Sequence, residues 1–171
     1  MTERPTFDEL FSKCMRSAIH LEMRDTYTPD DPVYLDWKAG RDIDPVERFR
    51  GWFDVVEKTV SRGVNIRRAR VVSEPLTDFI RHEYEVTPRL NIPAGERVRW
   101  LPRRQASDLV LPGNDFWVFD DQLVRFGYFA GDGTYLGHEI VTDPRVVKIC
   151  VDAFEPVWER AIDHADYQPA P

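Results

Sequence analysis

Two arginine-rich stretches are the residues in this sequence best suited to bind an anion. Arg68 and Arg70 lie in one stretch and Arg97 and Arg99 in another, and in both stretches charged residues alternate with apolar ones. This alternation is typical of a β-strand, where side chains two positions apart share a face. If the two strands are neighbours, four guanidinium groups line one surface. Arginine makes planar, bidentate contacts with phosphate and carboxylate groups.

The alternative is that these arginines are neutralised by carboxylates of the same chain. The sequence has 30 Asp and Glu against 23 Lys and Arg, and its formal net charge is -7. Such an acidic balance favours internal pairing and argues against direct binding of nucleic acid, which strongly basic domains prefer. The possible partners are Glu83, Glu85, Asp115, Asp120 and Glu139.

A second basic group is predicted on an N-terminal helix that begins at Thr6. Thr6 and Glu9 have the spacing of a capping box, and apolar residues then recur every three or four positions as far as Leu21. His20 and Arg24 fall on the polar side of this helix, where they would form a weaker wall of the anion site. The alternative is a solvated helix face.

Few residues have the spacing of a catalytic or metal site. The four histidines are scattered, and the sequence contains no HExxH pattern, Cys/His cluster, GxSxG turn or phosphate-binding glycine loop. No metal or cofactor is expected. The catalytic alternative is a hydrolase or nuclease that uses His20, Glu22 and Asp25 with the acids between Asp115 and Asp121, and it requires these groups to meet in one cleft.

The elements that must position these groups are predicted to form a single α/β sandwich domain over residues 1–171. The length and the 42% hydrophobic content are sufficient for one core. We expect a helical part at 6–63, a sheet part at 64–162 and a frayed tail at 163–171. Helices should cover a mixed or antiparallel five-stranded sheet whose last three strands form a meander. The five strands are predicted at 64–72, 96–101, 116–119, 123–129 and 135–141.

Capping residues predict three further helices. Asp44 followed by Pro45 starts one that ends near Gly63, the segment 73–75 opens another, and Asp143 followed by Pro144 starts the last. The residues between 34 and 37 form only a short apolar segment.

The composition also predicts a cytoplasmic protein. No apolar run approaches the ~20 residues of a membrane span, and the N-terminus lacks the apolar segment of a signal peptide. Cys14 and Cys150 lack metal-type spacing and are expected to be buried free thiols on helix faces.

Four runs of sequence are familiar together, and the resemblance that rests on them extends over nearly the whole chain. In these runs the chain resembles a family of small actinobacterial proteins known only as a domain of unknown function. Members of that family are often encoded beside Xre-type helix-turn-helix regulators, which implies a regulatory or toxin–antitoxin-like setting. The runs lie at 16–25, 67–75, 98–102 and 111–121.

The second half, from about Val64 to Ile162, is also similar to a degenerate phospholipase-D-like half. The resemblance implies a phosphotransfer fold with an N-terminal helical extension. The catalytic pattern of that superfamily is His-x-Lys followed by Asp, and no histidine here has Lys two positions later. The resemblance therefore implies an active site that is lost or reused.

These observations lead to the expectation of a non-catalytic regulatory or protein-interaction protein. Its partner would be a helix-turn-helix regulator or a second copy of the chain. An arginine-lined cleft would bind a small anion or a nucleotide. The sequence specifies neither the ligand nor the partner nor the oligomeric state. The expected ligand-binding residues are Arg68, Arg70, Arg97, Arg99, His20 and Arg24.

Overall fold

A seven-stranded sheet forms the middle layer of the protein. The computed structural model describes residues 5–171, so residues 1–4 of the predicted domain lie outside the described part. The strands are arranged in the order β6-β5-β4-β1-β2-β3-β7. The three central strands β1, β2 and β3 run parallel, and the other pairs are antiparallel. The strands are β1 (Ser17–Glu22), β2 (Asn65–Val72), β3 (Arg97–Pro102), β4 (Phe116–Phe119), β5 (Leu123–Phe129), β6 (Tyr135–Val141) and β7 (Ile162–Asp163).

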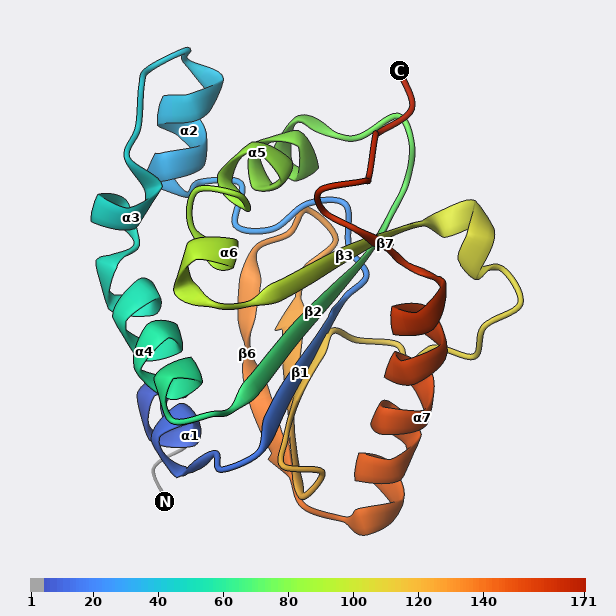
Figure 1. Ribbon diagram of the computed structural model, residues 1–171. Helices are drawn as coiled ribbons and strands as arrows, with labels where there is room; N and C mark the ends of the chain where they lie inside the picture. The colour runs from blue at the N-terminus through green and yellow to red at the C-terminus, as the bar shows by residue number, and fades with distance from the viewer. Residues whose placement is uncertain (1–4) are drawn as a thin grey trace.

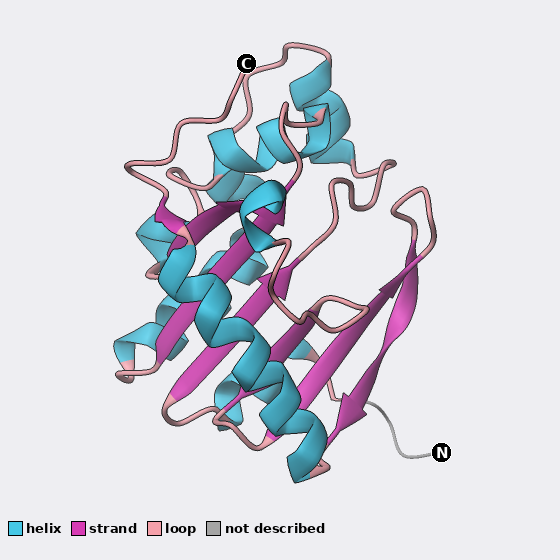
Figure 2. Ribbon diagram, turned by 90° about the vertical axis from the view of Figure 1, so that its right-hand side faces the viewer, coloured by secondary structure: helices cyan, strands magenta, loops and turns pink. Residues whose placement is uncertain are grey.

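Helices cover both faces of this sheet. The helices α1 to α6 lie on one face and the long helix α7 lies on the other, which makes a three-layer α/β/α arrangement (Figures 1 and 2). No helix of the described residues is both long and apolar enough to cross a membrane. The helices are α1 (Phe7–Lys13), α2 (Pro32–Lys38), α3 (Pro45–Arg48), α4 (Arg50–Ser61), α5 (Asp78–Val86), α6 (Asn91–Ala94), the short 3-10 helix η1 (Arg103–Ala106) and α7 (Pro144–Arg160).

The predicted N-terminal helix is the main correction to the sequence analysis. Its capping box between Thr6 and Glu9 is confirmed, but α1 ends at Lys13 and residues 17–22 form β1. The carboxylate of Asp120 accepts hydrogen bonds from the backbone N–H groups of residues 15, 16 and 17, which holds the chain in a turn. Strand β1 is covered on both faces, and a short strand of that kind has an apolar run that periodicity cannot distinguish from a helix.

The remaining elements follow the prediction with shifted boundaries. All five predicted strands are present and the last three form the expected meander, but β1 and β7 raise the total to seven. The predicted helix from Asp44 is interrupted at Phe49, which separates α3 from α4. The helix expected to open at 73–75 begins later, after its N-cap Thr77. The short apolar segment noted at 34–37 is part of α2, which spans 32–38 behind the N-cap Asp31.

Two apolar clusters hold the layers together. Helix α7 packs through Val147, Cys150 and Phe154 on one face of the sheet, and α1 and α4 pack through Phe11 and Val56 on the other. The C-terminal segment, which we expected to fray, instead packs against the sheet. Its Tyr167 is 2% exposed and stacks on the ring of Trp100 at 5.5 Å.

The two cysteines are free and buried, as predicted. Burial raises the pKa of the Cys14 thiol to about 12 and that of Cys150 to about 11. Both thiols are therefore protonated near neutral pH, and neither is suited to act as a nucleophile.

Candidate functional site

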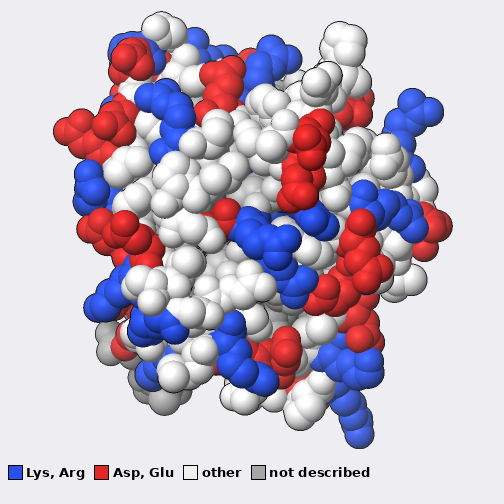
Figure 3. All heavy atoms as spheres, in the orientation of Figure 1, with Lys and Arg blue, Asp and Glu red and all other residues white. Residues whose placement is uncertain are grey.

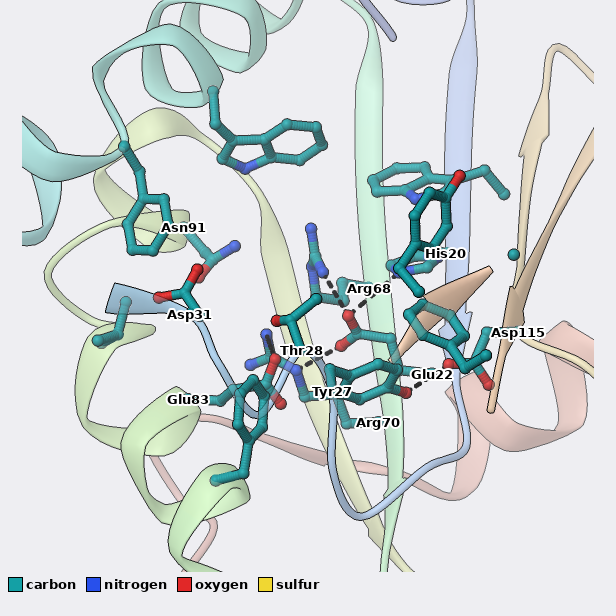
Figure 4. A pocket seen from close by; sticks show the side chains of 18 of the residues that line it. His20, Glu22, Tyr27, Thr28, Asp31, Arg68, Arg70, Glu83, Asn91 and Asp115 are labelled. Atoms are coloured by element: carbon teal, nitrogen blue, oxygen red, sulfur yellow. Dashed lines mark hydrogen bonds and ion pairs between the residues drawn. The ribbon is translucent and has the colours of Figure 1, made fainter. Parts of the chain in front are cut away.

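A cavity of about 530 Å³ opens on the sheet face that α1 to α6 cover. Its floor is formed by β1, β2 and β4, and its walls come from β5, α4, α5 and the chain between β1 and α2 (Figure 4). This volume lies within the range of small-molecule sites. Nine aromatic residues of the described chain line it: Phe7, Tyr27, Phe49, Trp52, Phe79, Phe116, Trp117, Phe129 and Tyr135.

Arg68 lies on the cavity floor between two carboxylates. Its Nε donates to Glu96 at 2.7 Å and its Nη1 donates to Glu22 at 2.8 Å. Arg68 is 7% exposed, and the side chain of Glu96 is fully buried. Burial alone would lower the pKa of Arg68, but the carboxylates of Glu96 and Glu22 raise it above its usual value. The guanidinium of Arg68 is thus already neutralised by its own chain.

Arg70 continues the same buried network. Its Nε donates to Glu22 at 2.5 Å, its Nη1 donates to Thr87 at 2.7 Å, and its Nη2 lies 3.5 Å from Glu83. Burial raises the pKa of Glu22, but Arg70 and Arg68 together hold that pKa well below its usual value. Glu22 is therefore ionised and shared by both arginines.

The other two predicted binding residues lie on the opposite face of the sheet. Strands β2 and β3 are neighbours, as the prediction required, but their parallel register pairs Ala69 with Arg99 and Val98 with Arg68. Registered residues of parallel strands share a face, so Arg97 and Arg99 point toward α7 and away from Arg68. The four guanidiniums therefore do not line one surface, and that expectation was wrong.

Arg97 and Arg99 have contacts of their own beneath α7. Both guanidinium groups lie over the ring of Trp158, at 5.3 Å and 4.5 Å from its centre. Arg99 also forms an ion pair with Asp163 at 3.0 Å. These contacts are cation–π and surface pairs that pack the helix on the sheet.

His20 lies in the cavity, although it belongs to a strand and not to the predicted helix. Its ring stacks on Trp117 at 4.2 Å. Its Nδ1 lies 2.8 Å from the carbonyl oxygen of Phe116, and its Nε2 lies 3.1 Å from Glu22. Each ring nitrogen therefore lies within hydrogen-bond distance of an oxygen of the protein itself.

Arg24, predicted as a neighbour of His20, is directed elsewhere. Its Nη2 donates to the carbonyl oxygen of Ala130 at 2.6 Å, and its guanidinium lies over Phe129. It lines a second, polar hollow of about 320 Å³ beside the loop at 111–114, together with Arg103. The structure thus brings Arg68, Arg70 and His20 together and separates them from Arg24.

The residues of the catalytic alternative converge only in part. Glu22 contacts His20, and Asp115 lines the same cavity. Asp25 lies outside it and accepts hydrogen bonds from Ser73. Asp120 serves the backbone turn before β1. Within the described chain, the predicted His/Glu/Asp set is therefore divided among separate places.

Sequence reasoning missed a pair formed by Tyr27 and Asp115 (Figure 4). The phenol of Tyr27 donates to Asp115, whose other oxygen accepts the N–H of Met23 at 2.9 Å. Burial raises the pKa of Asp115, and burial together with Asp115 raises the pKa of Tyr27. The two residues are 88 positions apart and no local pattern connects them.

Of two adjacent residues of α5, the sequence analysis named Glu83 only as a possible partner of the arginines, which its contact with Arg70 bears out, and it missed His82. His82 and Glu83 both line the cavity, and neither His82 ring nitrogen nor Oε2 of Glu83 has a hydrogen-bond partner among the described residues. Burial raises the pKa of Glu83 to about 7, and burial lowers the pKa of His82. Positions 82 and 83 therefore present polar groups that the protein itself does not satisfy.

A comparison with protein families identifies the family of this chain. Residues 5–169 match the family model described as a domain of unknown function (DUF6879). The chain belongs to this family. Among curated proteins, no sequence matches it.

Two solved structures are similar to this DUF6879 protein, and the first of them, Nuc, shares its general fold. Nuc, a phospholipase D family member from Salmonella typhimurium, is 12% identical with a TM-score of 0.50, and the match covers 91% of this chain and 86% of Nuc. The likeness therefore extends beyond the second half, where we expected it. TrmBL2, an archaeal chromatin protein whose structure shows a mode of DNA binding, is 14% identical with a TM-score of 0.49. The match covers 90% of this chain but spans only about half (47%) of TrmBL2.

Proposed function

We propose that this DUF6879 protein binds a small organic molecule in the aromatic cavity and does not transform it. The observation that carries the proposal is the combination of an open cavity of about 530 Å³ with aromatic walls and a rigid, internally paired floor. Apolar walls with a few convergent polar groups are typical of small-molecule sites. A floor held by buried ion pairs keeps its shape when the cavity is empty.

The side chains of the cavity favour binding over catalysis. Each ring nitrogen of His20 lies next to an oxygen of the protein itself, which disfavours His20 as a base for a substrate proton. Within the described chain, no lysine, serine or cysteine lines the cavity. The position two residues after His20 is Glu22, so a phospholipase-D-like fold here lacks the lysine of that catalytic pattern. These points leave the hydrolase or nuclease alternative with little support.

The predicted anion or nucleotide ligand has also lost its main support. It required free guanidinium groups, whereas Arg68 and Arg70 are paired with Glu22, Glu96 and Glu83. An anion would have to displace a carboxylate from a buried ion pair. The predicted regulatory role and the predicted partner, a helix-turn-helix regulator or a second copy, stay predictions.

Thr28 offers a way to close the cavity. It lines the cavity and its backbone φ is +34°, a conformation that is uncommon for a β-branched residue. A larger side chain without β-branching adds no backbone cost there. The variant Thr28→Trp therefore fills the cavity, and Thr142→Trp, at an exposed position outside it, is the matched control.

The test is native mass spectrometry of the protein purified gently from its own cells, followed by a fragment screen of the purified protein. We expect wild type and Thr142→Trp to carry or bind the same small molecules, and Thr28→Trp to lose them. Wild-type protein that carries no small molecule and gives no saturable fragment binding would overturn the proposal. Retention of every ligand by Thr28→Trp would overturn the assignment to this cavity.

A further inference from the structure

Acidic groups outnumber basic ones around the cavity. Four carboxyl groups and three guanidinium groups line it, and a fifth carboxylate, Glu96, lies directly behind Arg68. On the face of the molecule drawn in Figure 3, charged side chains of both signs are interspersed. The lining carboxyl groups are Glu22, Asp31, Glu83 and Asp115, and the guanidinium groups are Arg68, Arg70 and Arg125.

The positive charges of Arg68 and Arg70 are already paired with carboxylates, whereas Arg125 has no carboxylate partner among the described residues and its Nε is buried without a partner. Glu22 and Glu96 take the short contacts of Arg68 and Arg70, between 2.5 and 2.8 Å. The guanidinium of Arg125 lies 4.0 Å from the ring centre of Phe7 and donates to the hydroxyl of Tyr135. Glu83 has only one long contact with a guanidinium among the described residues: its Oε1 lies 3.5 Å from Nη2 of Arg70.

Of the cavity carboxyl groups that contact an arginine, Glu83 is therefore the one that is least compensated by positive charge. Its Oε2 is buried without a partner among the described residues, and both nitrogens of the neighbouring His82 are in the same state. His82 is 5% exposed, so a polar side chain more than nine-tenths buried stands unpartnered in the cavity wall. Buried polar groups without partners are rare and call for an explanation such as a ligand.

Aromatic rings lie beside this pair. Phe79 is one helical turn before His82, with ring centres 6.1 Å apart, and Tyr27 lies 5.9 Å from Phe79. Both rings line the cavity. Aromatic faces attract organic cations, and this attraction increases where water is excluded.

From this arrangement we infer that the ligand is an organic cation: an ammonium or amidinium group that pairs with Glu83, attached to an apolar or aromatic body held by the surrounding rings. The inference rests on the proposed function, because it names the chemical class of the ligand for the same cavity. The cation donates to the free Oε2 of Glu83, and a ligand N–H or O–H can donate to His82. Binding then supplies the partner that Oε2 of Glu83 lacks.

Protonation makes the inference measurable. Because the pKa of Glu83 is about 7, the fraction of Glu83 that is ionised rises from about 0.1 at pH 6 to about 0.9 at pH 8. A cation binds the ionised form, so its affinity should rise about tenfold over this interval and binding should release a proton. Burial lowers the pKa of His82, which favours its neutral form. The charged or titratable groups around Glu83 are Arg70, Arg68, Glu22, Asp115 and Tyr27.

The experiment uses probes matched in shape and different in charge. Tryptamine, tryptophol and indole-3-acetate share the indole ring system and carry an ammonium, a hydroxyl and a carboxylate, respectively. Phenyl and naphthyl compounds with the same three groups extend the set. Each probe is titrated calorimetrically into wild type, Glu83→Gln and the exposed control Glu57→Gln at pH 6 and pH 8. The amines should bind best, gain about tenfold at pH 8, and lose at least tenfold in Glu83→Gln but nothing in Glu57→Gln.

The other outcomes separate the two proposals. Preferential binding of alcohols or carboxylates that Thr28→Trp abolishes would overturn the cation inference and leave the cavity as a binding site. Amine binding that persists in Glu83→Gln would also overturn the inference. If no probe of any charge binds, the inference and the proposed function both fail.

Discussion

Strands β2 and β3 carry arginines on both faces, and the two faces use them differently. Toward the cavity, Arg68 and Arg70 are 7% and 4% exposed and contact carboxylates that are themselves buried. Toward α7, Arg99 is partly exposed, and half of the side chain of its partner Asp163 is accessible to solvent. One side is a closed ionic network, and the other is a partly exposed layer of guanidiniums over a tryptophan ring.

The difference teaches that burial, and not residue type, decides what an arginine does here. A buried charge loses its hydration and is tolerated only when carboxylates and hydrogen bonds compensate. Removing one member leaves the others uncompensated. A partly exposed charge is screened by water and salt, so its pair contributes little and its stem and ring contacts contribute more.

The largest effect should come from breaking the network on the cavity side. We expect Arg68→Met to destabilise the protein by about 3–5 kcal/mol, because it leaves the fully buried carboxylate of Glu96 without its ion pair. Chemical denaturation monitored by tryptophan fluorescence measures this free energy. A loss below about 1 kcal/mol would show that the two faces are energetically alike.

The next largest effect concerns how the stability of the protein depends on pH through Glu83, which lies on the same face. The pKa of Glu83 is about 7 in the folded protein against an ordinary value of 4.5, so the folded chain keeps a proton that the unfolded chain has lost. Stability is therefore lost as the pH rises from 4.5 through 7. We expect Glu83→Gln to leave stability nearly unchanged at pH 4 and to raise it by up to about 3 kcal/mol at pH 8.

Denaturation curves at pH 4, 6 and 8 measure how the free energy of unfolding changes with pH, which is the slope that this prediction concerns. The exposed variant Glu57→Gln should show the wild-type slope. A Glu83→Gln protein with the wild-type slope would contradict the assignment of a raised pKa to Glu83.

A smaller effect is expected for the hydroxyl of Tyr27. Tyr27→Phe removes the donor to the buried carboxylate of Asp115 and should cost about 1–2 kcal/mol, since the N–H of Met23 still donates to Asp115. The midpoint of thermal unfolding measures the loss. An unchanged midpoint would show that Asp115 is compensated by another group.

The smallest effect is expected on the α7 side. Arg99→Met should cost less than about 1 kcal/mol, because its ion pair with Asp163 is partly exposed and the methionine stem keeps the packing on Trp158. The loss should shrink further in 0.5 M salt. A loss equal to that of Arg68→Met would remove the contrast between the faces.

Local signals in the sequence were sufficient for much of the fold. The capping box at Thr6 and Glu9, the cap at Asp143 and the five alternating or apolar strands were all predicted from neighbouring residues. The path of residues 17–22 was not, because a strand covered on both faces has the same apolar run as a helix. Its turn depends on Asp120, more than 100 positions later.

The site was less accessible to sequence reasoning. Alternation correctly put Arg68 with Arg70 and Arg97 with Arg99, but which pair faces the cavity depends on the register between β2 and β3. Register is set by the packing of the whole sheet, and a shift of one residue reverses the faces. Glu83 was named only as one of five possible partners of the arginines, and its raised pKa could not be predicted because it depends on burial and on Arg70 and Glu22 of other elements.

The central claim is that the cavity binds a cation through Glu83 while its arginines stay paired. Its most direct test is a crystal structure of the protein with the amine that binds best. We predict the ammonium nitrogen within hydrogen-bond distance of Glu83 Oε2, with the contacts of Arg68 to Glu96 and of Arg70 to Glu22 intact. An amine placed outside this cavity, or guanidiniums that leave their carboxylates to contact the ligand, would contradict the account.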